Sequence, residues 1–245
     1  MEIKRFFVNR DRELQVGTSV EVSGDEYIHA IKVSRYKVGY RLILSNGDGY
    51  DYFATITEIG KDRFFCHIDE RKKNENELSK PLSLYLCGIE RSDFAVQKAT
   101  EVGASRIRFL ISEHTNAKEQ HLDRLKRIAL ESAKQCGRAV IPEILSPVSF
   151  ADGVKEAISE CGRVIICYED AKEGRIAEAM DPEIESYALV IGSEGGFTPD
   201  EVSYAESLGA KIVTLGRRIL RAETACIAGL VLMAEEVERY ENSGH

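Results

Sequence analysis

The spacing of hydrophobic and polar residues changes near residue 80 and divides the chain into two parts. The first 70 residues contain short β-rich runs separated by turn residues, at 3–8, 18–22, 41–45, 52–59 and 63–68. Asn46 and Gly47 lie between two of these runs and predict a hairpin, whereas residues 25–34 have the pattern of a helix. We therefore expect this part to be a small, barrel-like β domain.

A polar and charged segment at 69–81, ending at Pro81, is the best linker candidate. Beyond it, strand patterns at 82–88, 106–111, 163–168, 187–192 and 211–216 alternate with helix patterns at 92–103, 119–137 and 200–209, and with a final helix to about Tyr240. This alternation predicts an α/β domain with a mostly parallel sheet. The expected domains are 1–72 and 73–245, and the 245 residues suffice for either one large core or two smaller ones.

Composition indicates an ordinary globular protein, with 43% hydrophobic and 30% charged residues. No apolar stretch approaches the roughly 18 residues needed to cross a bilayer, and the N-terminal residues do not have the pattern of a secretory signal. The six cysteines are scattered without a CxxC pair, and the five histidines do not cluster. We therefore expect reduced thiols in a cytoplasmic protein, with no metal site and no disulfide framework.

Charge is distributed unevenly along the chain, whose net charge is -8. Residues 1–138 contain 24 Lys+Arg against 21 Asp+Glu, whereas residues 139–245 contain 9 against 20. The mildly basic first part permits an RNA-contacting surface. Ordinary solvated faces explain the same charge equally well.

The segment "VIGSEGGFTPDEV", residues 190–202, joins a buried strand to a helix start that has a capping box at Thr198 and Glu201. Gly192, Gly195 and Gly196 expose backbone groups at the carboxyl end of the strand, where open α/β folds bind ligands. The segment lacks the dinucleotide and P-loop glycine patterns, and it lacks the glycine that a hydrolase elbow needs two residues before the serine. A tight turn without a ligand remains the alternative.

A second segment, "KIVTLGRRILRAETACIAGL", also passes from a strand through a glycine to a helix. Two such strand ends predict one pocket built from both loops, with Ile219, Leu220 and Ala225 as apolar walls. Its three arginines, at 217, 218 and 221, fit a solvated basic turn as well as a ligand site.

These two loops, together with "RSDFAVQKATEVGASRI" and "ESAKQCGRAVIPEI", resemble the RsmE family of ribosomal RNA small subunit methyltransferases, in the SPOUT superfamily. "RFFV" and "HAIKVSRYKVGYRLILSNGDG" are similar to the family's PUA-like N-terminal module, so the resemblance covers nearly the whole chain. It implies a SPOUT trefoil-knot methyltransferase domain behind a PUA-like β-barrel, S-adenosylmethionine as cofactor, a homodimer, and N3 methylation of one uridine in the 16S RNA of the small ribosomal subunit.

The resemblance also implies which residues contact the cofactor: Gly192, Ser193, Glu194, Gly195 and Gly196 from one loop, and Leu215, Gly216, Ile219, Leu220, Arg221, Thr224 and Ala225 from the other. Glu169, just past the strand at 163–168, is a further candidate for a cofactor contact or a base. A solvated acidic loop is the alternative for Glu169.

Methylation at N3 requires that the ring proton leave before or during attack. A protonated arginine cannot remove that proton, but it can stabilise the anion that forms. We therefore predict Arg138 and Arg221 as catalytic residues, without naming the base. Arg5, His29, Arg35 and Lys37 are the predicted RNA contacts, with a packed histidine as the alternative for His29. A methyltransferase acting on another RNA and a non-catalytic RNA-binding assembly factor remain open.

Overall fold

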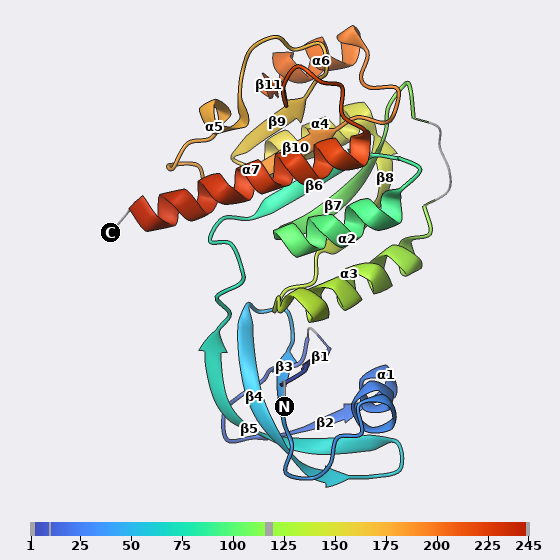
Figure 1. The fold of residues 1–245 in the computed structure, drawn as a ribbon, viewed down its shortest axis with the longest axis vertical. Helices are drawn as coiled ribbons and strands as arrows, with labels where there is room; N and C mark the ends of the chain where they lie inside the picture. Colours follow the sequence, from blue (N-terminus) through green and yellow to red (C-terminus); the bar gives the residue numbers. More distant parts are fainter. Residues whose placement is uncertain (1–2, 10, 116–119, 244–245) are drawn as a thin grey trace. The chain divides into compact units, whose positions relative to one another are not determined.

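The computed structural model describes residues 3–9, 11–115 and 120–243, and the chain forms two compact units (Figure 1). The first unit is Met1–Glu77 with Ala133–Ile141, and the second is Leu78–Ser132 with Pro142–His245. The sequence did not predict that Ala133–Ile141 belongs to the first unit. None of the described helices is long and apolar enough to cross a membrane.

The first unit is a curled, mixed five-stranded sheet. It consists of β1 (Arg5–Phe7), β2 (Ser19–Ser23), β3 (Arg41–Ser45), β4 (Tyr50–Ile59) and β5 (Arg63–Lys73), in the order β1-β3-β4-β5-β2. β1 is parallel to β3 and the other pairs are antiparallel, so the hairpin predicted at Asn46–Gly47 is confirmed between β3 and β4. The predicted helix is also present, as α1 (Gly24–Tyr27) continuing into the π-helical turn η1 (Ile28–Val33).

The predicted linker is more ordered than its composition suggested. β5 runs to Lys73 because residues up to that point pair with β4, so the linker prediction was wrong for the first part of 69–81. Asn74 is buried, and its side chain donates to the carbonyl of Gly137 at 3.0 Å. Glu77 accepts the backbone N–H groups of Ala139 and Val140, each at 2.9 Å. These polar contacts bind Ala133–Ile141 into the first unit.

The second unit is an α/β domain around a six-stranded sheet in which every pairing is parallel, as predicted. The strands are β6 (Leu82–Cys87), β7 (Ala104–Ile111), β8 (Glu143–Ser149), β9 (Arg163–Cys167), β10 (Tyr187–Ile191) and β11 (Lys211–Val213), in the order β11-β9-β10-β6-β7-β8. All five residues of β10 are buried, as expected for a central strand covered on both faces.

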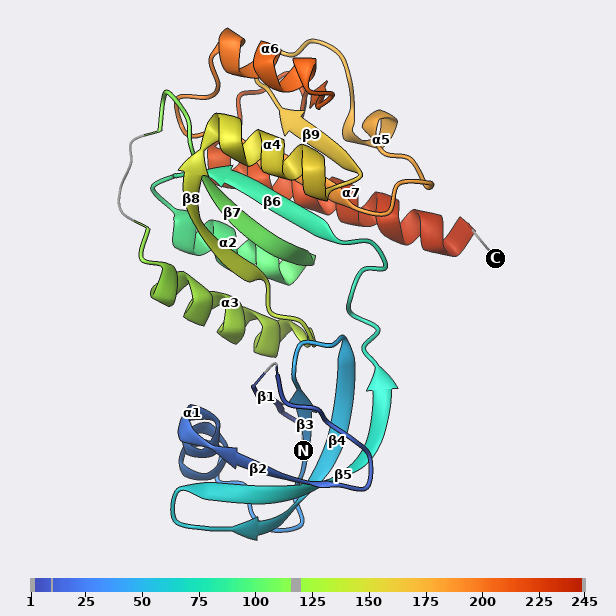
Figure 2. The ribbon, with the colours of Figure 1, turned by 180° about the vertical axis from the view of Figure 1, so that it is seen from behind.

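Helices cover both faces of this sheet (Figure 2). They are α2 (Ser92–Val102), α4 (Phe150–Glu160), α5 (Ile176–Ala179), α6 (Pro199–Ser207) and α7 (Ala222–Ser243), while α3 (Leu122–Cys136) runs from this unit into the first one. α2 and α7 pack together and against β6, β7 and β10, whereas α4 packs against β6 to β9 and α6. The central strands are therefore enclosed, and the strand ends are left to form a site.

Three elements of this unit were missed from the sequence: β8, α4 and α5. β8 contains Pro147 and lies at the sheet edge, where a proline is tolerated and strand patterning is weak. α4 contains Gly153, which is unfavourable in a helix interior. A Cβ at Gly153 would overlap the side chain of Leu110 on β7, so close packing against the sheet accounts for the glycine. The trefoil knot stays a prediction.

Candidate active site

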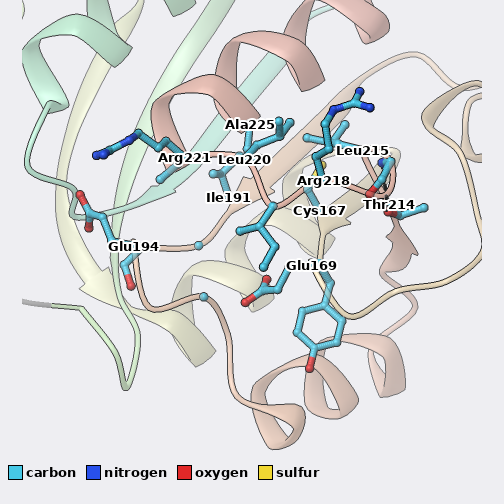
Figure 3. Close-up of a pocket in the computed structure, with 17 residues that line it drawn as sticks. Cys167, Glu169, Ile191, Glu194, Thr214, Leu215, Arg218, Leu220, Arg221 and Ala225 are labelled. Atoms are coloured by element: carbon cyan, nitrogen blue, oxygen red, sulfur yellow. Dashed lines mark hydrogen bonds between the residues drawn. The ribbon is translucent and has the colours of Figure 1, made fainter.

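A cavity of about 320 Å³ lies at the carboxyl ends of β9, β10 and β11. Its lining comes from residues within three segments, 167–169 at the end of β9, 191–196 at the end of β10 and 214–225 after β11 (Figure 3). Because the three strands are parallel, their loops emerge at one edge of the sheet, where open α/β folds bind ligands. Both glycine-containing loops singled out in the sequence therefore belong to one cavity, as predicted.

The first loop, residues 192–197, is a compact turn between β10 and α6. The N–H of Gly196 donates to the carbonyl of Ser193 at 3.0 Å, and Gly196 has a φ of +69°. A Cβ at Gly196 would overlap the carboxylate of Glu169, so the position requires glycine both for its conformation and for space.

The helix that follows the first loop begins with the predicted capping box. Thr198 Oγ1 accepts the N–H of Glu201 at 3.2 Å, and the Glu201 carboxylate accepts the N–H of Thr198 at 3.0 Å. The loop is therefore anchored at its downstream end by the start of α6.

The second loop, residues 214–221, is more open. Thr214 Oγ1 accepts the N–H of Gly216 at 3.1 Å, and Gly216 has a φ of +116°. Beyond this turn, Ile219 is 88% exposed although it lines the cavity. An isoleucine this exposed at a concave site can be covered by a ligand or by another chain.

Charged groups of both signs line the cavity. Glu169 and Glu194 supply carboxylates, and Arg218 and Arg221 supply guanidinium groups. In Figure 3, Glu194 and Arg221 lie on one side of the cavity, whereas Arg218 lies on the other with Leu215 and Thr214. The site can thus offer hydrogen-bond acceptors to a cation and donors to an anion, next to apolar walls.

Cys167 also lines the cavity. Burial raises the pKa of its thiol to about 12, and the neighbouring Cys226 acts in the same direction. Cys167 is therefore a neutral, apolar part of the cavity lining rather than a nucleophile. Among the described residues, no group of three or more His, Cys, Asp or Glu side chains could hold a metal ion.

The cavity includes most of the residues predicted to contact a cofactor. Its lining contains Glu169, Gly192, Ser193, Glu194, Gly196, Leu215, Gly216, Ile219, Leu220, Arg221 and Ala225. Gly195 and Thr224 are outside the lining: Gly195 lies against His114, and Thr224 is an exposed residue of α7. The roles of these residues stay predictions.

Five other lining residues were not predicted: Cys167, Tyr168, Ile191, Thr214 and Ala222. Arg218, which the sequence left open between a solvated turn and a ligand site, also lines the cavity. Cys167 and Ile191 end β9 and β10, and Thr214 follows β11 directly. The parallel order of the strands was the signal that could have identified these residues, because it places all three strand ends at one edge.

Arg138, predicted to be catalytic, is buried in the first unit and is 3% exposed. Its Nε and Nη2 donate to the carboxylate of Glu77 at 3.1 and 2.8 Å. Arg221, the other predicted catalytic residue, is exposed at the cavity. The structure therefore places the two arginines in different environments and different units.

The four predicted RNA contacts also differ in exposure. Arg5 is 8% exposed, and its guanidinium donates to Asp51 and to Ser45 inside the unit. His29 is half-buried, with its ring 5.7 Å from that of Phe6. Arg35 and Lys37 are exposed, and Arg35 has a φ of 56°, which is unusual for a residue with a Cβ.

Comparison with known proteins agrees with this architecture. A family model described as an RNA methyltransferase domain matches residues 74–234, and an RNA methyltransferase PUA domain matches residues 22–69. A ribosomal RNA small subunit methyltransferase E from Mesomycoplasma hyopneumoniae is 36% identical over 230 residues, covering 91% of this chain and 95% of that protein. A Rickettsia conorii protein of the same name is 27% identical, with 94% of each chain covered.

A similar solved structure is the ribosomal RNA small subunit methyltransferase E of Neisseria gonorrhoeae bound to S-adenosylmethionine, with a TM-score of 0.85, 27% identity, and 96% and 98% of the two chains covered. The fold and the matched models define an RNA methyltransferase with an N-terminal PUA domain. Within that class, the chain belongs to the ribosomal RNA small subunit methyltransferase E family, and the resemblance predicted from the loops is confirmed.

Proposed function

We propose that this protein transfers the methyl group of S-adenosylmethionine to N3 of one uridine in the 16S RNA of the small ribosomal subunit. The relatives' names support a small-subunit ribosomal RNA substrate, and the similar Neisseria gonorrhoeae structure is bound to S-adenosylmethionine. The observation that carries the proposal is the cavity formed by both glycine loops in a chain of this family. A cytoplasmic location is part of the proposal.

The lining of the cavity fits this cofactor. Leu215, Leu220 and Ala225 supply apolar walls for a flat base, while the glycine turns leave backbone groups accessible for its polar edges. Glu169 and Glu194 place negative charge at the cavity, which suits a ligand carrying a sulfonium and an ammonium group. When bound, the cofactor supplies an electrophilic methyl group.

The chain's own residues would orient the uracil and stabilise the charge on its oxygens as the N3 proton leaves. Arg221 is suited to this role because it is exposed at the cavity and its guanidinium offers several hydrogen-bond donors. Arg138 remains a second catalytic candidate, although its binding to Glu77 supports a structural contribution. A carboxylate such as that of Glu169 is a candidate for the proton acceptor.

RNA binding is assigned to the first domain, residues 1–72, and methyl transfer to the second, residues 73–245. Arg35 and Lys37 are the strongest candidates for phosphate contacts because both are exposed. His29 can add a contact from its half-buried position. Arg5 would act indirectly, through its contacts with Asp51 and Ser45.

A homodimer is the proposed assembly. Ile219 is 88% exposed, and Val231 and Leu232 on α7 are 45% and 43% exposed. A second copy of the chain can bury these apolar side chains. Sedimentation equilibrium should show a dimer at micromolar concentration, and Ile219→Asp should shift it toward monomer. A wild-type chain that sediments only as monomer would contradict this part of the proposal.

The central experiment measures methyl transfer from labelled S-adenosylmethionine to small ribosomal subunits and to naked 16S RNA, both from cells that lack this enzyme. Mass spectrometry of the digested RNA should identify 3-methyluridine at one position. Product on transfer RNA but not on small subunits would favour a methyltransferase with another substrate. A folded protein that does not bind S-adenosylmethionine would favour a non-catalytic RNA-binding factor.

A matched pair of glycine variants tests the cavity itself. Gly196 and Gly209 both have positive φ, at +69° and +99°, so alanine strains the backbone at both positions. Only at Gly196 does the new Cβ overlap Glu169, because nothing lies within 4 Å of the corresponding position at Gly209. Gly196→Ala should abolish cofactor binding and Gly209→Ala should retain it. Equal affinities in the two variants would show that the first loop does not hold the cofactor.

A further inference from the structure

The turn that follows β7, residues Ser112–Thr115, packs against the first cavity loop. Ser193 Oγ donates to the backbone carbonyl of His114 at 3.0 Å. In the opposite direction, the ring Nδ1 of His114 lies 2.9 Å from the carbonyl oxygen of Gly195. Two hydrogen bonds of opposite sense thus join segments that are about 80 residues apart in the sequence.

The protonation of the His114 ring follows from its partner. A carbonyl oxygen can only accept, so Nδ1 carries a hydrogen and donates it to Gly195. Both the neutral tautomer with a proton on Nδ1 and the imidazolium can make this bond. The contact therefore needs a donor at this place and does not need a basic nitrogen.

The peptide between Gly195 and Gly196 is held at both of its polar groups. His114 binds the Gly195 carbonyl, and the Gly196 N–H donates to the carbonyl of Ser193 at 3.0 Å. A Cβ at Gly195 would lie 2.8 Å from the Cβ of His114, so the histidine packs directly on this glycine. The orientation of this peptide sets the position of Gly196, which lines the cavity beside Glu169.

Neighbouring backbone groups support the same loop from outside the cavity. The N–H of Glu90, after β6, donates to Glu194 Oε1 at 2.8 Å, and the N–H of Glu113 donates to Glu201 Oε1 at 3.0 Å. In these two supports the acceptor is a side chain of the loop or of α6. In the contact of His114 with Gly195 the side chain lies outside the loop, so a substitution of His114 removes this hydrogen bond without changing any loop residue.

We propose that His114 is a positioning residue for the methyl donor. By donating from Nδ1 to the Gly195 carbonyl, it holds the Gly195–Gly196 peptide in the orientation that the cofactor meets. This role rests on the proposed binding of S-adenosylmethionine in the cavity. His114 acts through the loop rather than by touching the reacting atoms.

Two substitutions separate the donor from the imidazole. In His114→Asn the side-chain amide nitrogen takes the place of Nδ1, whereas His114→Ala removes the donor and leaves the Gly195 carbonyl without it. Calorimetric titration with S-adenosylmethionine should show affinity about tenfold weaker for His114→Ala, the effect of losing one hydrogen bond to a constrained carbonyl. His114→Asn should bind within about threefold of wild type. His67→Ala, at an exposed histidine of β5, is the matched control and should not change affinity.

Turnover and hydrogen exchange complete the test. His114→Asn should retain methyl transfer, and the Gly196 amide should exchange faster in His114→Ala than in wild type or His114→Asn, even without cofactor. Unchanged affinity and exchange in His114→Ala would overturn the inference. So would a His114→Asn variant that binds the cofactor normally but loses about 100-fold in turnover, because that pattern is expected of a catalytic base. If the wild type did not bind S-adenosylmethionine, the proposed function would be wrong, while the exchange data would still show whether His114 holds the loop.

Discussion

Two arginines of the first unit and two at the cavity of the second unit occupy opposite environments. In the first unit, Arg5 and Arg138 are 8% and 3% exposed and donate to Asp51 and Glu77. At the cavity of the second unit, Arg218 and Arg221 are exposed, and their side chains make no hydrogen bond or ion pair with the described residues. A buried guanidinium needs a partner to offset its desolvation, whereas an exposed one at a cavity is available to a ligand. Exposure, more than residue type, therefore distinguishes the arginines that are bound inside the first unit from those that a ligand at the cavity can reach.

The largest effect on activity is expected for Arg221→Ala. Loss of a preorganised cationic donor at a reaction site lowers turnover by about 100-fold or more, while an exposed substitution should change the free energy of unfolding by less than about 0.5 kcal/mol. Methyl transfer under saturating cofactor and urea unfolding measure the two quantities. Arg217→Ala is the neighbouring control, because Arg217 is exposed but outside the cavity lining. Equal turnover in the two variants would show that Arg221 does not take part in methyl transfer.

Arg138→Ala should instead act on stability. It removes a buried cation that Glu77 binds through two hydrogen bonds, so the free energy of unfolding should fall by about 3 kcal/mol. The chain lacks tryptophan, and far-ultraviolet circular dichroism in urea is therefore a suitable measurement. A variant as stable as wild type but inactive would reverse this expectation and support the catalytic role predicted from the sequence.

Arg5→Ala tests whether the second buried arginine behaves like the first. Asp51 still accepts hydrogen bonds from Asn74 in this variant, so its carboxylate keeps a donor. We therefore expect the free energy of unfolding to fall by a smaller amount, about 2 kcal/mol. In the folded protein, the salt dependence of RNA binding should be unchanged, because the guanidinium faces the interior. A reduced salt slope without a loss of stability would instead place Arg5 at a phosphate.

The sequence predicted the parts of this structure that local chemistry determines. Residues 198–201 carry a capping pattern and form the capping box, and the two glycine segments form one cavity. The sequence did not predict that Arg138 binds Glu77 or that His114 binds Gly195, because these partners are 61 and 81 residues apart. Local patterns carry no information about which distant group meets an arginine, so the two arginine environments could not be told apart. Gly153 shows the same limit, since only Leu110 on β7 explains it.

Arg35→Ala should have the smallest effect. It tests whether an exposed arginine of the first unit contacts RNA. Arg35 is exposed in the first unit, so its loss should leave the free energy of unfolding nearly unchanged and weaken RNA binding only a few-fold. If it contacts one phosphate, the slope of log K against log salt should fall by about 0.7 to 0.9. Lys155→Ala, at an exposed position of α4, is the control for loss of one positive charge and should leave that slope unchanged. An identical slope in wild type and Arg35→Ala would show that exposure in the first unit is not sufficient for RNA contact, and the RNA face would then have to be sought at Lys37 and His29.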